Sequence, residues 1–208
     1  MSERGKLVTL EGVDGAGKST HMEFIADALR AGAGTAGRHV IVTREPGGTD
    51  LAERVRVTIL EQAMAPGMET LLLFAARADH VARVIEPALA AGTWVVCDRF
   101  SDATAAYQGG GKGVPLELIE RLQELAHPGL SPARTLVFDC PYEVARERLA
   151  ASRKSLDRFE REDRGFFERV RGAYLARARA EPGRMRVIDA RADLAAIREA
   201  ITGHLCGL

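Results

Sequence analysis

A glycine-rich segment near the N-terminus constrains this chain more than any other feature. Residues 12–19 read G-V-D-G-A-G-K-S and fit the pattern G-x-x-x-x-G-K-[ST]. The short apolar run Leu7–Leu10 precedes the segment and is typical of a buried strand. The stretch Thr20–Arg30 follows it and carries apolar residues at helical spacing. A strand, a glycine loop and a helix in this order predict a phosphate-binding P-loop in an α/β protein.

Each part of this loop has a chemical task. Glycines allow backbone N–H groups to approach phosphate oxygens, and the N-terminus of the following helix favours an anion. We expect Lys18 to reach the β- and γ-phosphates of a nucleotide and Ser19 to ligate Mg²⁺. The competing interpretation, an ordinary turn, gives no purpose to Lys-Ser directly after the last glycine. The predicted ATP-binding residues are Gly12, Val13, Asp14, Gly15, Ala16, Gly17, Lys18, Ser19 and Thr20.

Strand-like and helical patterns alternate along the rest of the chain. Apolar runs predict five strands, at Lys6–Leu10, His39–Thr43, Thr93–Cys97, Thr135–Phe138 and Met185–Ile188. Helical spacing predicts helices at Lys18–Ala31, Asp50–Gln62, Met68–Ala91, Pro115–Ala126, Tyr142–Ala151, Glu160–Ala180 and Asp193–Cys206. The alternation predicts a parallel five-stranded sheet with helices on both faces. In such sheets ligands bind beyond the C-terminal ends of the strands.

Length and charge limit the class of protein. The 208 residues predict a single domain, residues 1–208, with a normal core. Lys+Arg and Asp+Glu are equal at 29 each, which gives the whole chain no attraction to nucleic acid. The chain has no signal-peptide pattern, no apolar run of membrane-spanning length and no metal-binding cysteine spacing. We therefore expect a cytoplasmic protein that binds neither membrane nor nucleic acid.

The residues directly after three predicted strands carry charges suited to anions and metal ions. Arg44 follows the second strand and leads into a Pro-Gly-Gly turn, where it can bind an anion. Asp98 follows the third strand in the arrangement of a Walker-B carboxylate directed at Mg²⁺, and Arg99 comes next. Asp139, after the fourth strand, is a competing Walker-B residue, although its favoured role is to cap the following helix.

Two other segments are candidates for ligand contact. The apolar helix around Leu71–Arg77 has Phe74 and Arg77 three residues apart on one face, where they can stack on a planar base and bond its edge. On composition alone, Phe74 is more typical of a core residue. The cluster Gln108–Gly113 contains three consecutive glycines and predicts a loop, and its neighbours indicate that this loop flanks a ligand.

Cations are concentrated in the C-terminal third of the chain. Between residues 146 and 186, twelve Arg and one Lys face seven acidic residues, a surplus suited to a polyphosphate. Three of these cations, Arg153, Lys154 and Arg158, lie in a polar break that predicts a lid at about residues 150–160. An arginine supplied to a moving phosphoryl group is worth about 10³–10⁵ in rate. Because the P-loop has Gly15 where an arginine can stand, we expect this arginine to come from the lid.

These segments together resemble the thymidylate kinase family of nucleoside-monophosphate kinases over nearly the whole chain. The specific matches are T-R-E-P-G-G-T at Thr43–Thr49, L-L-L-F-A-A-R at Leu71–Arg77, D-R-F at Asp98–Phe100, A-Y-Q-G-G-G at Ala106–Gly111 and L-D-R-F-E at Leu156–Glu160. They occur in the family's order. The resemblance implies a P-loop NTPase fold, phosphoryl transfer from ATP to dTMP with Mg²⁺, and a homodimer paired through helices.

The resemblance also implies roles for individual residues. It implies Arg44 and Arg99 on the dTMP phosphate, and Tyr107 against the sugar. It further implies Phe74 stacked on thymine and Arg77 on the thymine edge, with Thr104 and Gln108 nearby. Asp14 would contact the sugar 3′-hydroxyl or the water shell of the metal. The implied metal ligands are Ser19 and Asp98. The implied catalytic residues are Lys18, Asp14, Arg99, Arg153 and Arg158.

Several points stay open at the level of sequence. Lys154 stands where similar lids often have Gly, and His21 stands where Gln is common. Residues Asp189–Asp193 are the expected contact for adenine. A kinase for another monophosphate, such as dUMP, is the nearest alternative. A non-catalytic nucleotide switch is a more distant one, because the guanine-reading motif N-K-x-D is absent.

Overall fold

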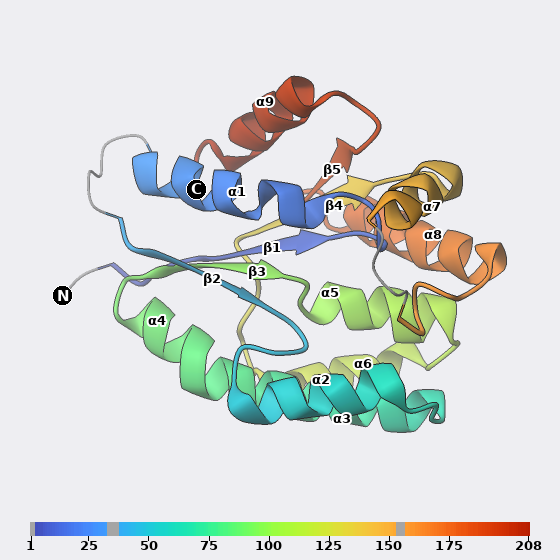
Figure 1. The fold of residues 1–208 in the computed structure, drawn as a ribbon. Helices are drawn as coiled ribbons and strands as arrows, with labels where there is room; N and C mark the ends of the chain where they lie inside the picture. The colour runs from blue at the N-terminus through green and yellow to red at the C-terminus, as the bar shows by residue number, and fades with distance from the viewer. Residues whose placement is uncertain (1–2, 33–37, 153–156) are drawn as a thin grey trace.

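A parallel five-stranded sheet forms the centre of the computed structural model, which describes residues 3–32, 38–152 and 157–208 (Figure 1). The strand order is β2-β3-β1-β4-β5, and every neighbouring pair is parallel. The strands are β1 (Leu7–Glu11), β2 (Val40–Arg44), β3 (Trp94–Asp98), β4 (Arg134–Asp139) and β5 (Met185–Asp189). The predicted fold class is therefore confirmed.

Each strand ends one residue later than the sequence pattern predicts, because its last residue is polar. The final residues of β1 to β5 are Glu11, Arg44, Asp98, Asp139 and Asp189. Arg44 pairs with Asp98 across β2 and β3, and Asp139 pairs with Asp189 across β4 and β5. The sheet thus presents a row of charged side chains at its C-terminal edge, where ligands of such folds bind.

Helices cover both faces of the sheet (Figure 1). Figure 1 shows α1 and α9 on one side and α2 to α6 on the other. The helices are α1 (Lys18–Ala31), α2 (Asp50–Glu61), α3 (Pro66–His80), α4 (Glu86–Ala90), α5 (Ser101–Thr104), α6 (Leu116–Ala126), α7 (Tyr142–Ala151), α8 (Arg164–Ala180) and α9 (Leu194–Leu205). In the described ranges, none of them is both long and apolar enough to cross a membrane.

The starts of three helices follow ordinary capping chemistry. Thr49, Asp163 and Asp193 each accept a backbone N–H two or three residues inside α2, α8 and α9, as N-cap side chains do. Because Asp163 caps α8, that helix begins at Arg164 and not at Glu160 as predicted. By contrast, α1 follows Gly17 at φ 91° and has no side-chain cap. Its first N–H groups therefore remain available to an anion.

The helix predicted over Met68–Ala91 is interrupted. The α-helix α3 runs from Pro66 to His80, a π-helical turn η1 (Val81–Ile85) follows, and α4 continues to Ala90. Pro66 suits the first turn of α3, where its missing N–H is not needed. Pro87 lacks the N–H that would bond the carbonyl four residues earlier, and a wider turn is a usual response to such a loss.

The glycine cluster after α5 is not the loop that the sequence predicts, so that prediction is wrong. Residues Ala105–Gly111 form a π-helical segment, η2, that packs against α8. A Cβ on Gly110 would lie 2.5 Å from the Cβ of Ala173, and a Cβ on Gly111 would lie 2.5 Å from Cε2 of Phe166. These glycines therefore permit close contact between two helical segments, and this contact positions the preceding residues, Tyr107 and Gln108.

Candidate active site

A cavity of about 610 Å³ lies at the C-terminal edge of the sheet. The P-loop residues 14–20 line it together with Arg44, Asp98, Arg99 and Arg148. The loop takes a shape that only glycine adopts easily: Gly15 has φ 80°, and a Cβ there would lie 2.5 Å from the carbonyl oxygen of Ala145. The structure thus gathers seven of the nine residues predicted for ATP, Asp14–Thr20, around one space of nucleotide size.

The side chain of Lys18 is hydrogen-bonded to the backbone of its own loop. Its Nζ donates to the carbonyl oxygens of Gly12 at 3.0 Å and Val13 at 3.2 Å, and the side chain is buried. Burial lowers the pKa of Lys18, and the positive charge of Arg99 lowers it further. A phosphate bound in the loop would place additional negative charge beside this ammonium and so favour its charged form.

Arg99 and Asp14 form the centre of the charged edge. Arg99 has φ 71°, the only positive value at a non-glycine residue in the described part of the chain. Its Nη2 donates to Oδ1 of Asp14 at 2.5 Å, and the hydroxyl of Tyr107 donates to Oδ2 of Asp14 at 2.8 Å. Burial alone raises the pKa of Asp14, but Arg99 and Lys18 outweigh it and hold that pKa below its ordinary value. Asp14 is therefore an ionised carboxylate at neutral pH.

The residues expected for Mg²⁺ suit that ion. Oδ1 of Asp98 is buried and has no hydrogen-bond partner in the described structure, and Ser19 lines the same cavity. Outside the masked segments, no three His, Cys, Asp or Glu residues cluster as a protein cage for a metal. Mg²⁺ typically takes one or two protein oxygens and completes its shell with water and phosphate. The competing Asp139 instead accepts from Arg171 at 2.6 and 2.9 Å.

A second, smaller cavity of about 90 Å³ adjoins the first. The two cavities share Asp14, Glu45, Arg56 and Arg99 in their walls. The second cavity contains most residues predicted for a monophosphate, namely Arg77, Arg99, Thr104, Tyr107 and Gln108. The structure therefore places two binding spaces end to end, with Arg99 and Asp14 at their junction.

Arg77 lines the second cavity, and three hydrogen-bond partners hold its side chain. Its Nε donates to Glu45 at 2.6 Å, and its Nη2 donates to the Phe100 carbonyl and to Oγ1 of Thr104, both at 3.1 Å. Nη1 is buried without a partner among the described residues. Burial raises the pKa of Glu45, but Arg77 and then His80 outweigh it and keep the pKa below its ordinary value. Glu45 thus provides a fixed negative charge that orients Arg77.

Phe74 does not line either cavity. Its ring packs with Ala105, Val114 and Ile119 in a separate apolar cluster and is 3% exposed. Leu73, four residues before Arg77, lines the second cavity in its place. Residues four apart stack along a helix more closely in line than residues three apart, so the turn of α3 directs Leu73 rather than Phe74 at the space beside Arg77.

The predicted lid is only partly within the described residues. Arg153 and Lys154 lie outside them. Arg158 donates to the buried carboxylate of Glu69 and to the carbonyl of Ile59 at 2.5 Å, so it lies on the side of α2 and α3. Arg158 is not among the residues that line the P-loop cavity.

Two arginines in the cavity walls were not singled out from the sequence. Arg148 on α7 donates to the carbonyls of Ala16 at 3.4 Å and Ala190 at 2.8 Å. The cation surplus between residues 146 and 186 was the signal that could have found it. Arg56 lines both cavities from α2, and nothing in the local pattern marks it. In the expected adenine segment, Ala192 lines the cavity, while Asp189 is exposed and paired with Arg191.

Comparison with known proteins agrees with this geometry. A sequence model of the family described as thymidylate kinase matches residues 10–201. A thymidylate kinase of Bordetella petrii is 53% identical over 208 residues, covering 100% of this chain and 98% of that protein. A thymidylate kinase of Cupriavidus necator is 54% identical over 196 residues, covering 94% of this chain and 95% of that protein.

A solved structure gives the same result for the fold. The crystal structure of thymidylate kinase from Ehrlichia chaffeensis matches with a TM-score of 0.76 and 32% identity, over 96% of this chain and 98% of that one. The sequence matches and the shared fold therefore lead to one conclusion: this chain belongs to the thymidylate kinase family.

Proposed function

We propose that the protein transfers the γ-phosphoryl group of ATP to dTMP and forms ADP and dTDP. The observation that carries this proposal is the junction of two cavities at Arg99 and Asp14, with a P-loop on one side and an incompletely bonded Arg77 on the other. A donor and an acceptor nucleotide bound end to end would bring their phosphates together at Arg99. Phosphoryl transfer requires mainly such positioning and the neutralisation of charge.

ATP would bind in the larger cavity. Backbone N–H groups of Gly12–Thr20 and the start of α1 would bind the phosphates, and Lys18 would move from the Gly12 and Val13 carbonyls onto the β- and γ-phosphates. Ser19 and Asp98 would hold Mg²⁺, which when bound neutralises phosphate charge and aligns the reacting oxygens. Arg148 would add a further positive charge near the phosphates.

dTMP would bind in the smaller cavity. Arg44 and Arg99 would bind its phosphate, Asp14 its 3′-hydroxyl, and Tyr107 would lie against the sugar. Nη1 of Arg77 would donate to a carbonyl of the thymine, with Thr104 and Gln108 nearby. The resemblance implies that Phe74 stacks on the base, but the packing of Phe74 supports Leu73 as the apolar contact.

The catalytic cations of the lid are part of the same proposal. Arg153 and Arg158 would neutralise charge on the moving phosphoryl group. Arg158 would first have to leave Glu69, which also accepts from Gln108 at 2.7 Å and from Lys112 at 2.8 Å. Because Lys112 and Gln108 stay bonded to Glu69, release of Arg158 would not leave that buried carboxylate unpaired.

We further infer one kinase domain, located in the cytoplasm, that pairs with a second copy. Exposed apolar side chains on α2, α3 and α6 support the pairing, and Figure 1 shows these helices gathered on one side of the sheet. They are Leu51, Val57, Met68, Leu71, Leu116, Leu118 and Leu125. An apolar face of this kind is typical of an interface between protein chains.

A coupled assay with ATP and Mg²⁺ tests the reaction. Across dTMP, dUMP, dCMP, dGMP and AMP, we expect the highest kcat/KM for dTMP. One methyl group in a pocket gives about 10–200-fold discrimination, so dUMP should be a poor substrate rather than an excluded one. A preference for a purine monophosphate would contradict the proposed substrate, and nucleotide binding without any turnover would favour the non-catalytic switch.

Leu73→Ala and Phe74→Ala are expected to have different effects. Leu73→Ala should raise KM for dTMP about tenfold, because an aliphatic contact of about 1.5 kcal/mol or more is lost from the cavity wall. Phe74→Ala should instead lower the free energy of unfolding by about 3–5 kcal/mol, because it opens a void in a buried cluster. Kinetics and chemical denaturation of both variants check this. If Phe74→Ala had the larger effect on KM, the stacking role of Phe74 would stand.

Leu71→Glu is expected to convert the dimer to a monomer. Leu71 is 52% exposed on α3, and burying an unpaired carboxylate there would be costly. Light scattering should give twice 22.5 kDa for the unmodified chain and 22.5 kDa for the variant. Val187→Glu is the matched control, since Val187 is exposed on β5 away from these helices. A monomeric unmodified chain would contradict the pairing.

A further inference from the structure

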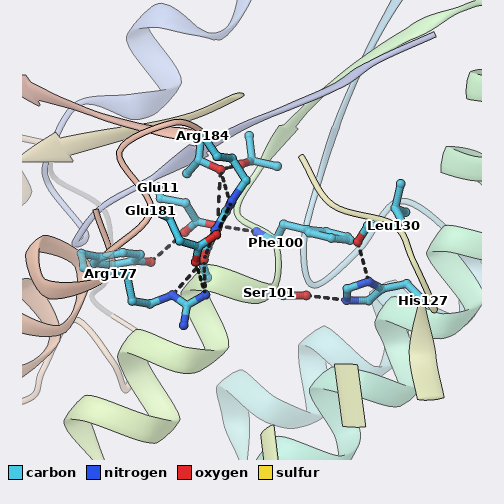
Figure 2. A network of polar contacts seen from close by, with 12 residues as sticks. Glu11, Phe100, Ser101, His127, Leu130, Arg177, Glu181 and Arg184 are labelled. Carbon is cyan, nitrogen blue, oxygen red and sulfur yellow. Dashed lines mark hydrogen bonds and ion pairs between the residues drawn. The ribbon is translucent and has the colours of Figure 1, made fainter. Parts of the chain in front are cut away.

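Glu11 is a fully buried carboxyl group directly beneath the charged edge of the sheet. It is the last residue of β1 and is 0% exposed. Its Oε1 accepts from the backbone N–H of Phe100 at 2.7 Å (Figure 2), and its Oε2 forms a hydrogen bond of 2.8 Å with the hydroxyl of Tyr174. Neither cavity described above is lined by Glu11, so it touches no substrate directly.

These two hydrogen bonds both lead to Arg99. Phe100 directly follows Arg99, whose φ of 71° is unfavourable for a residue with a side chain and must be held by its surroundings. The Tyr174 hydroxyl, besides its hydrogen bond with Glu11, accepts from Nη1 of Arg99 at 3.3 Å. Glu11 therefore supports the Arg99 turn at its backbone and, through Tyr174, at its guanidinium group.

Charged groups from four neighbouring elements face Glu11. Asp102 approaches from α5, Arg99 from the end of β3, Tyr174 from α8 and Lys18 from α1. Cys97 on β3 also lies near enough for its own pKa to be raised by Glu11, after the larger effects of burial, Glu45 and Asp98. Asp102 is itself bound by Arg177 and Arg184, both of which are labelled in Figure 2.

We propose that Glu11 is a positioning residue of the monophosphate site: its hydrogen bonds with the Phe100 N–H and the Tyr174 hydroxyl hold Arg99 in place for the substrate phosphate. The inference rests on the proposed binding of the dTMP phosphate by Arg99. When Glu11 ionises, its negative charge would compete with that phosphate for Arg99 and repel the phosphate across the junction.

The electrostatics of the site agree with a neutral Glu11 at pH 7. Burial, and secondarily the charge of Asp102, raise the pKa of Glu11 from 4.5 to about 8. Arg99 and the hydrogen bonds from Tyr174 and Phe100 oppose this rise without overcoming it. Glu11 is therefore about half ionised near pH 8, and the affinity for the monophosphate should fall as the pH passes through this value. The protonated form donates from Oε2 to the Tyr174 oxygen, and the ionised form accepts from the Tyr174 hydroxyl.

The test is the pH dependence of KM for dTMP and for ATP between pH 7 and 9.5. For the unmodified chain, KM for dTMP should rise about tenfold between pH 7 and 9, as expected when a single ionisation near pH 8 blocks binding. In Glu11→Gln, which mimics the neutral acid, KM for dTMP should match the unmodified chain at pH 7 and stay flat to pH 9. The change of KM for ATP with pH should be the same in both proteins. An unaltered alkaline rise in Glu11→Gln would overturn the inference.

Two further variants keep the test decisive if Glu11→Gln does not fold. Tyr174→Phe removes a hydrogen bond that lowers the pKa of Glu11, so the rise in KM should move to higher pH. Asp102→Asn removes a charge that raises this pKa, so the rise should move to lower pH. Opposite shifts support the proposal, and an unchanged midpoint in both variants contradicts it.

A matched control and the basal reaction separate this inference from the proposed function. Thr9→Val alters a buried residue of the same strand, which bonds Thr135 at 2.8 Å, and should leave the profile unchanged. A shift in Thr9→Val equal to that in Glu11→Gln would mean a general effect of strand β1 and would overturn the role of Glu11.

If the unmodified chain does not phosphorylate dTMP at all, the proposed function itself fails. If it does so with no rise in KM up to pH 9.5, only the role of Glu11 fails.

Discussion

Lys18→Ala is expected to reduce kcat by at least about 10²–10³-fold while leaving the fold intact. The loss corresponds to one charged donor removed from the developing charge of the transition state. Lys18 is the only lysine among the residues lining the P-loop cavity in the described structure, so no neighbouring ammonium replaces it. The measurement is the steady-state rate with ATP and dTMP.

The structure predicts little loss of stability in this variant. Burial and Arg99 lower the pKa of Lys18, which means that the folded state disfavours its charged form. Removing the ammonium therefore takes away a group that burial penalises, and the thermal midpoint should be nearly unchanged. Lys6→Ala is a suitable control, because Lys6 lies at the opposite end of β1, over the ring of Trp94. Turnover of Lys18→Ala within tenfold of the unmodified chain would exclude the P-loop role of Lys18.

Arg77→Ala is expected to change both substrate affinity and stability. KM for dTMP should rise about 10–100-fold, because a charge-assisted hydrogen bond to the base is lost, while KM for ATP changes little. The free energy of unfolding should fall by about 3–5 kcal/mol, because Glu45 is 3% exposed and loses its charged partner. Equal effects on the two KM values would place Arg77 outside the monophosphate pocket.

A second substitution separates these two effects. In Arg77→Ala combined with Glu45→Gln, no buried carboxylate is left without its cation, so most of the lost stability should return. The KM for dTMP should remain raised, because the donor to the base is still missing. Denaturant unfolding and kinetics on the single and double variants provide the measurement. Recovery of KM together with stability would mean that Arg77 acts only through the fold.

The case of Phe74 shows that a sequence match can identify a segment and still leave open which of its side chains contacts the substrate. The segment Leu71–Arg77 was identified from its sequence motif, and two residues of its helix, Leu73 and Arg77, line the second cavity. Which of two adjacent apolar residues faces the cavity depends on the rotation of α3 against α2 and α6. A rotation of about 100° per residue separates Leu73 from Phe74, and only packing sets it.

Local patterns along the chain were enough to predict the sheet, the P-loop and the charged strand ends. Their physical causes are local: apolar runs form strands, glycines permit the loop, and polar residues end the strands at one edge. Sequence also predicted Asp98 as the more suitable metal ligand, although the occupation of Asp139 by Arg171 became visible only in the structure.

The partners of the buried charges were decided by the tertiary structure. Tyr174 and Glu11 are 163 residues apart, Arg99 and Tyr174 are 75 apart, and Arg158 and Glu69 are 89 apart. The hydrophobic periodicity of the sequence cannot predict contacts between residues so far apart, because these contacts form only when the helices pack on the sheet. Burial and these neighbours also set the pKa of Glu11, Asp14 and Lys18. The sequence by itself thus determined which chemical groups the site contains, and only the fold determined which of them are charged, paired or left for a substrate.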